Sequence, residues 1–325
     1  MIELLKKLML TPGVSGREEK IRQVIEDEIR PYADEVTTDN MGNLIARKKG
    51  EGKKIMLCAH MDEIGFFVTH IGSDGLLSVA PIGGINFLSA SYAEVVSEKG
   101  VYGVLVPTIK KAIPAGDEVK IDIGAKDKKQ AEKKVSVGDS FMVKPSMRRL
   151  LNNKYVGRPF DDRVGCLALI ETLKQIKSPK NDLYFVFSVQ EEVGGRGSYP
   201  ATYSIKPDIA IAVDVTCEGD KPNSPKMTVS LGKGCAIKIK DSSMICNGEL
   251  VQKMRELAIE ENIKYQDEIL LAGGTDGANM QITAGGSMAG VISIPTAFIH
   301  SSVEMIDIKD VEASIKLLTV LCSKL

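Results

Sequence analysis

Four nearly continuous apolar stretches restrict the possible folds of this 325-residue chain more than any other feature. They cover residues 54–59, 183–189, 207–214 and 289–294. Apolar runs of this length are typical of strands that are buried on both faces of a sheet. Segments with the apolar spacing of helices alternate with these runs and cover residues 163–176, 248–262 and 310–325. The alternation predicts an α/β fold, an α/β/α sandwich with a mixed, mainly parallel sheet.

The sequence changes character over residues 66–158. Short strand-like runs are separated by turn residues there, and Asp74-Gly75 is a hairpin signal. We therefore expect a small, mainly antiparallel β-domain inserted into a larger domain. The larger domain is then discontinuous and consists of residues 1–65 and 159–325.

A helix is expected near the N-terminus. Ser15 and Glu18 have the spacing of a capping box, and the residues that follow have helical periodicity up to Pro31.

The charge and cysteine content exclude several classes of protein. The formal net charge is −1, so no basic surface for nucleic acid is expected. No apolar run is long enough to span a membrane, and the N-terminal residues lack the order of a signal peptide. The six cysteines are scattered without a C-x-x-C spacing. These features predict a reduced, cytoplasmic protein.

Charged and imidazole side chains directly follow the apolar runs, where the predicted strands end. They are His60 and Asp62 after the first run, Glu191 and Glu192 after the second, Asp214 at the end of the third, and His300 after the fourth. In addition, Asp161 and Asp162 precede the helix predicted at residues 163–176. Because ligands bind beyond the carboxyl ends of the strands in such sheets, we expect these side chains to share one pocket.

This set of side chains has the chemistry of a metal site. Imidazole nitrogens and carboxylate oxygens suit zinc, cobalt or manganese. The set exceeds the four ligands of one zinc ion, which favours two ions that share a carboxylate. Such ions explain why Glu191 and Glu192 are adjacent at the end of a buried strand: one binds an ion, and the other holds and deprotonates a water. Asp62 is placed to take the outer imidazole proton of His60.

Each residue also has a structural explanation. A single histidine at a strand end is often only hydrogen-bonded, and paired glutamates often lie in a solvated turn. Asp162 and Asp214 are suitable caps for a helix or a turn. The location of the whole set at one edge favours the metal site.

A glycine-rich segment, "LLAGGTDGANMQ", opens another predicted helix. Thr275, Asp276 and Gly277 are candidates for substrate contacts there. The alternative is a tight turn capped by Asp276. His70 lies inside a predicted hairpin strand and is expected to be structural, and Arg196 is the cation nearest to the glutamate pair in the sequence.

Six motifs resemble one known family. "AHMDEIGF", "GRPFDDRVG", "VQEEVGGRGS", "AVDVT", "GGTDGANM" and "IPTAFIHS" occur in the order typical of the tetrahedral-type (FrvX-like, glutamyl/deblocking) aminopeptidases. The resemblance covers essentially the whole chain. It implies a zinc-peptidase-like α/β/α sandwich with a β-barrel-like insertion that mediates dimerisation.

The resemblance also implies the role of each residue. Asp161 is expected to bridge two divalent ions, zinc or cobalt, with manganese also compatible. His60 and Asp214 complete the shell of one ion, and Glu192 and His300 that of the other. Glu191 is the expected general base, and Asp62 supports His60. The expected substrates are short peptides with free N-termini, cleaved in a homo-oligomer of dimers that assemble into a dodecamer.

Other functions fit parts of the pattern. Related folds include deacylases of N-acylated amino acids, which use the same metal chemistry. An endoglucanase-type glycoside hydrolase would also use two carboxyl groups, but it would leave both histidines unexplained. A sugar cleft usually contains aromatic platforms, and this chain has no Trp and 5% aromatic residues. A metal-binding structural subunit would not need the additional base.

Overall fold

The computed structural model describes residues 1–108, 118–222 and 224–325. The helices of the larger body are α1 (Ile2–Leu10), α2 (Glu19–Ile29), α5 (Arg163–Gln175), α6 (Ser198–Ile205), α7 (Gly248–Glu260), α8 (Asp276–Ile282) and α9 (Ile308–Lys324), with short 3-10 turns at η1 (Arg30–Tyr32) and η3 (Thr283–Gly285). Its strands are β1 (Glu35–Thr38), β2 (Leu44–Lys48), β3 (Lys54–His60), β10 (Ser146–Arg149), β11 (Lys154–Arg158), β12 (Asp182–Ser188), β13 (Ile209–Thr216), β14 (Cys235–Lys240), β15 (Tyr265–Ile269), β16 (Met288–Ala297) and β17 (Glu304–Asp307).

The strands of the larger body form one sheet with a parallel centre. The order is β1-β2-β12-β3-β13-β16-β17-β11-β10, and β14 joins β16 and carries β15. Strands β12, β3, β13 and β16 run parallel, and they are the apolar runs identified in the sequence. The predicted α/β fold with a mixed sheet is confirmed. At its margins, β2, β14 and β17 each run antiparallel to their central neighbour, and β15 runs parallel to β14.

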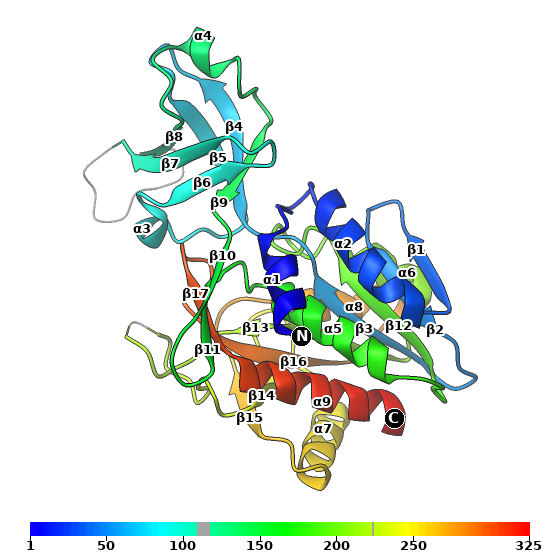
Figure 1. The fold of residues 1–325 in the computed structure, drawn as a ribbon. Helices are drawn as coiled ribbons and strands as arrows, with labels where there is room; N and C mark the ends of the chain where they lie inside the picture. The colour runs from blue at the N-terminus through cyan, green and yellow to red at the C-terminus, as the bar shows by residue number, and fades with distance from the viewer. Residues whose placement is uncertain (109–117, 223) are drawn as a thin grey trace.

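Helices cover both faces of this sheet (Figure 1). On one face, α5 packs against β3 and β13, and α1, α2 and α9 pack against α5. On the other face, α6 packs against β12 and α8 packs against β13. Within the described ranges, no helix combines the length and apolar character that a membrane span requires.

The insertion is a closed six-stranded barrel at one end of the molecule (Figure 1). Its elements are β4 (Gly65–Ile71), β5 (Leu77–Ile82), β6 (Glu94–Ser97), β7 (Tyr102–Pro107), β8 (Val119–Asp122) and β9 (Ser140–Val143), with the short helices α3 (Phe87–Ala90) and α4 (Lys128–Ala131). Phe66, Leu105, Ile121 and Phe141 are buried inside it. The predicted hairpin is present between β4 and β5, and Gly75 has the left-handed φ of +83° that its turn requires.

The C-terminal boundary of the insertion lies earlier in the sequence than the boundary predicted at residue 158. The last barrel strand ends at Val143, whereas β10 and β11 pair with each other and with β17. Residues 146–158 therefore belong to the large sheet. Short strand runs of both modules look alike in sequence, so only the pairing distinguishes them.

The predicted capping box at the start of α2 is wrong. The helix begins at Glu19, and no side chain caps it. The Ser15 hydroxyl instead donates to Asp62 Oδ2 over 2.6 Å, and Glu18 Oε1 accepts hydrogen bonds from the backbone N–H groups of Gly16 and Gln190. Both polar side chains are used by the functional site rather than by the helix.

Candidate functional site

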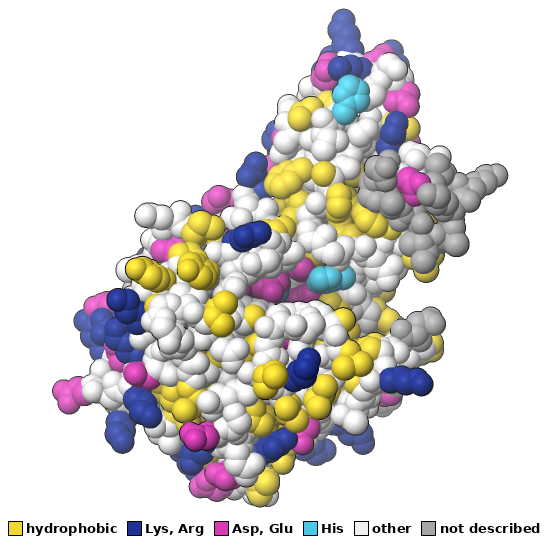
Figure 2. All heavy atoms as spheres, turned by 180° about the vertical axis from the view of Figure 1, so that it is seen from behind, with side chains coloured by type: hydrophobic (Ala, Val, Ile, Leu, Met, Phe, Trp, Pro, Cys, Tyr) yellow, Lys and Arg dark blue, Asp and Glu magenta, His cyan; other side chains and the backbone are white. Residues whose placement is uncertain are grey.

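A cavity of about 710 Å³ lies beyond the carboxyl ends of the central strands. Figure 2 shows a hollow in this face in which acidic side chains and a histidine gather. The structure brings six of the predicted residues to its lining: His60, Asp161, Glu191, Glu192, Asp214 and His300.

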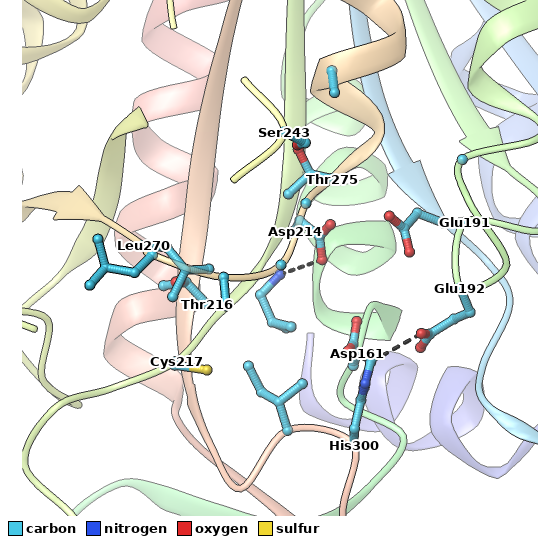
Figure 3. Close-up of a pocket in the computed structure, with 18 of the residues that line it drawn as sticks. Asp161, Glu191, Glu192, Asp214, Thr216, Cys217, Ser243, Leu270, Thr275 and His300 are labelled. Carbon is cyan, nitrogen blue, oxygen red and sulfur yellow. Dashed lines mark hydrogen bonds and ion pairs between the residues drawn. The ribbon is translucent and has the colours of Figure 1, made fainter. Parts of the chain in front are cut away.

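Two groups of potential ligands meet at Asp161 (Figure 3). In the first, His60 Nε2 lies 3.1 Å from Asp161 Oδ1 and 3.7 Å from Asp214 Oδ1. In the second, His300 Nε2 lies 3.2 Å from Asp161 Oδ2 and 3.0 Å from Glu192 Oε2. The ligand atoms within each group all lie within 4.8 Å of one another. Asp161 is the one residue common to both groups in the described part of the chain.

Asp62 is fully buried and contacts both His60 and the backbone of the glutamate pair. His60 Nδ1 lies 3.1 Å from the backbone carbonyl oxygen of Asp62 and 3.4 Å from its Oδ1, and Oδ1 also accepts the backbone N–H of Glu191 over 2.9 Å. Asp62 Oδ2 accepts the backbone N–H of Glu192 over 3.2 Å. Asp62 thus orients the imidazole through its carbonyl and its carboxylate, and the carboxylate also fixes the backbone of the glutamate pair.

The turn that carries the glutamates is held from both ends. Gln190 has a left-handed backbone with φ of 56°, and Glu18 accepts its N–H over 3.1 Å. The Asn279 side chain on α8 donates to the carbonyl of Gly195 over 2.7 Å. At Gly195, any added Cβ would lie 2.3 Å from the Asn279 amide nitrogen. The glycine therefore permits the close approach of α8.

Glu304 on β17 fixes the backbone of Asp161 through hydrogen bonds. Its Oε2 accepts the N–H groups of Phe160 and Asp161 over 2.6 and 3.2 Å. Asp162 next to it caps α5, because its Oδ1 accepts the N–H of Gly165 over 3.0 Å. Asp162 therefore has the structural role of a helix cap, whereas Asp161 faces the cavity.

Sequence reasoning missed several of these supporting residues. Ser15 and Glu18 were assigned to a helix start, and Glu304 follows no apolar run that would have singled it out. Cys217 was also missed, although it lines the cavity. Burial raises the pKa of its thiol, so it is a neutral side chain there.

Burial shifts the ionisation of the carboxylates in the cavity. It raises the pKa of Glu192 to about 7 and that of Glu191 well above its ordinary value. His300 loses solvation as well, but hydrogen bonds with Asp161 and Glu192 raise its pKa to about 11. Positive charge beside Glu191 and Glu192 would favour the ionised form of both carboxylates.

The residues present fit divalent cations. The donors are imidazole nitrogens and carboxylate oxygens, which suit zinc, cobalt and manganese. Asp161 directs one oxygen to each group, as a carboxylate shared by two ions would. Glu191 belongs to neither group, and its Oε2 lies 3.9 Å from His60 Nε2.

Only one of the three predicted substrate contacts lines the cavity, Thr275, which also caps α8 through the N–H of Gly277. Asp276 and Gly277 are buried behind it, and the Asp276 carboxylate accepts hydrogen bonds from Ser188 and Cys58. Arg196 is exposed and donates to the carbonyl of Val193, and His70 lies on the barrel strand β4. Among the described residues, Arg196 forms no ion pair with Glu191 or Glu192, and His70 lies in the barrel, away from the cavity lining.

Comparisons with known proteins identify the family of this chain. Residues 42–317 match the M42 glutamyl aminopeptidase family. The lysyl aminopeptidase of Pyrococcus furiosus is 36% identical over 342 residues, covering 99% of this chain and 97% of its own.

Two solved structures share the fold over the full chain. The aminopeptidase APDkam598 of Desulfurococcus kamchatkensis superimposes with a TM-score of 0.96 at 34% identity, covering 100% of this chain and 94% of its own. The TET1 peptidase of Pyrococcus horikoshii, described as able to assemble into a tetrahedron or a large octahedral shell, superimposes with a TM-score of 0.90 at 34% identity, covering 100% and 99%. The chain is therefore a peptide hydrolase that belongs to the M42 glutamyl aminopeptidase family.

Proposed function

We propose that this aminopeptidase removes residues from free peptide N-termini at a centre that holds two divalent cations. The observation that carries the proposal is the position of Asp161, whose two oxygens face two separate groups of ligands. His60, Asp161 and Asp214 would hold one cation, and Asp161, Glu192 and His300 the other. Zinc and cobalt suit these donors, and manganese is compatible with them.

When bound, such cations lower the pKa of a water molecule and polarise a carbonyl group. Glu191 serves as the general base, because it lines the cavity next to both ligand groups without belonging to either. It takes a proton from the attacking water and returns it to the leaving amine. Asp62 keeps Glu191 in place through its backbone N–H.

The barrel is proposed to mediate dimerisation, and the dimers to assemble into a tetrahedral dodecamer in the cytoplasm. Support comes from the full-length likeness to the TET1 peptidase of Pyrococcus horikoshii. An enclosed assembly of that kind would admit short peptides.

A digest of mixed peptides tests the proposed activity. Half of the pool has free N-termini and half is N-acetylated, and the enzyme is stripped of metal and then reloaded with zinc or cobalt. We expect stepwise loss of N-terminal residues, restored by metal, from the free peptides alone. Loss of acetate from the acetylated half would assign a deacylase instead, and no change in either half with metal bound would overturn the proposal.

A further inference from the structure

The wall of the cavity that lies across from the glutamate pair is apolar. The apolar side chains of the cavity lining include Val215, Cys217, Met227, Ile269, Leu270 and Ile299, and we refer to them as the apolar wall. Figure 3 shows Leu270, Thr216 and Cys217 on the side opposite Glu191 and Glu192. In the described part of the chain, the carboxylates of the lining are Asp161, Glu191, Glu192 and Asp214, and all four belong to the site already described.

Behind this wall lies a buried ion cluster that the reaction does not use. Lys238 on β14 is fully buried, and its Nζ lies 3.0 Å from Glu268 Oε1 and 3.1 Å from Asp241 Oδ2. Burial lowers the pKa of Lys238, but the two carboxylates raise it above its ordinary value, so the ammonium stays charged. Because the ammonium is fully buried, it is stable only when both carboxylates remain beside it.

The cluster is connected to the wall on both sides of Lys238. Glu268 accepts a hydrogen bond from the Thr216 hydroxyl over 2.7 Å and directly precedes Ile269. Asp241 Oδ1 accepts from the N–H and the hydroxyl of Ser243 over 2.8 and 2.7 Å. Thr216, Ser243 and Ile269 all line the cavity. A single ammonium therefore ties together the end of β13, the turn after β14 and the end of β15.

The lining favours an apolar substrate side chain over a charged one. Lys226 is its one Lys or Arg in the described ranges, and it is exposed. An exposed ion pair changes the binding affinity of a substrate by less than about tenfold. Burying a side chain of leucine size changes it by roughly tenfold to a hundredfold. Among the described lining residues, a basic side chain would meet no carboxylate outside the proposed metal and base residues.

We propose that this wall selects peptides whose N-terminal residue is large and apolar, and that Lys238 is the positioning residue that fixes the wall. The inference rests on the proposed aminopeptidase function.

A panel of fluorogenic aminoacyl substrates tests the substrate class. The metal-loaded enzyme is assayed with leucyl, methionyl, phenylalanyl, glutamyl and lysyl derivatives of one coumarin. We expect kcat/KM for the best apolar substrate to exceed the glutamyl and lysyl values by about tenfold or more. A glutamyl or lysyl optimum would overturn the inference and leave the aminopeptidase function intact. Absence of hydrolysis of all five would count against the proposed function itself.

A Leu270→Lys variant tests the wall directly. We expect the ratio of leucyl to glutamyl kcat/KM to fall by roughly tenfold or more, because the apolar contact is replaced by a cation. The matched control is Ile259→Lys on α7, an exposed isoleucine that does not line the cavity. An unchanged ratio in the Leu270 variant would overturn the assignment of this wall.

Lys238→Met tests the positioning role, with Lys6→Met, an exposed lysine on α1, as control. We expect a higher KM for the leucyl substrate and a lower leucyl-to-glutamyl ratio, with metal content unchanged. A purely structural role would reduce the folded fraction but leave this ratio unchanged, because the ratio does not depend on the amount of active enzyme. If the variant fails to fold, Thr216→Val removes the hydrogen bond to Glu268 while keeping the volume of this cavity-lining side chain, and an unchanged ratio there would overturn the role of the cluster.

Discussion

The two oxygens of Asp161 face two different histidines: Oδ1 lies 3.1 Å from His60 Nε2, and Oδ2 lies 3.2 Å from His300 Nε2. A single side chain thus joins two ligand groups whose other members come from β3, β13, the turn after β12 and the segment after β16.

Asp161→Asn should therefore affect both ligand groups at once. The amide keeps the volume but loses the negative charge that two cations would share. We expect bound metal, measured by mass spectrometry of the purified protein, to fall below one ion per chain. Activity should fall by more than about a hundredfold, the upper range for changes outside the ligand shell. Asp267→Asn, an exposed aspartate paired with Arg255, is the control. Two retained ions would refute the bridging role.

Glu191→Gln should separate metal binding from turnover. Glu191 belongs to neither ligand group, so metal content should match that of the unaltered protein. Because glutamine cannot accept and return the proton, kcat should fall by about 10²- to 10⁴-fold. Near-normal turnover with two bound ions would exclude Glu191 as the base.

Asp62→Asn should weaken the site without removing a ligand. An amide cannot accept all the hydrogen bonds that Asp62 receives, including those from the backbone of Glu191 and Glu192. We expect metal affinity to fall by about 10- to 100-fold in a chelator competition. Ser15→Ala, which removes one donor to the same carboxylate and leaves its contact with His60, should produce a smaller loss. Equal losses in both variants would contradict this ranking.

Ionisation of Glu63 should lower the free energy of unfolding of the metal-free protein as the pH rises. Glu63 is fully buried beside Arg163, and burial raises its pKa from 4.5 to about 7. Between these values the folded state keeps a proton that the unfolded chain has released, so stability falls as the pH rises through this window. The shift corresponds to about 3 kcal/mol.

The comparison with Glu63→Gln isolates this contribution. The difference in unfolding free energy between the two proteins should change by about 3 kcal/mol between pH 4.5 and pH 8. Urea unfolding of the metal-free proteins at several pH values measures it. A difference that does not vary with pH would show that Glu63 ionises normally.

The central strands and the residues at their ends were predictable because each carries a local signal. Buried parallel strands are apolar throughout, so the polar side chain that ends each run, such as His60 or Asp214, is conspicuous. The same rule placed Glu191 and Glu192 beside them, and the structure brings these residues to one cavity.

The supporting residues were not predictable in this way, because long-range contacts decide what they do. Ser15 and Glu18 match a capping box in sequence, yet Asp62 and Gln190 offer them buried partners that a helix end does not. Lys238 lies on β14 and looks like a surface residue of an edge strand. Only the fold shows that Glu268 and Asp241 enclose it.

The connection of the barrel to the large body limits how this protein can be shortened. The strand that ends at His60 leads into the first barrel strand at Gly65, and the return path through β10 and β11 leads to Asp161. A truncated version that removes residues 66–158 would leave its two cut ends close to His60 and Asp161 in the chain. A minimal enzyme should instead keep residues 61–64 and the β10–β11 hairpin, so that the linker joins the chain away from the reaction centre.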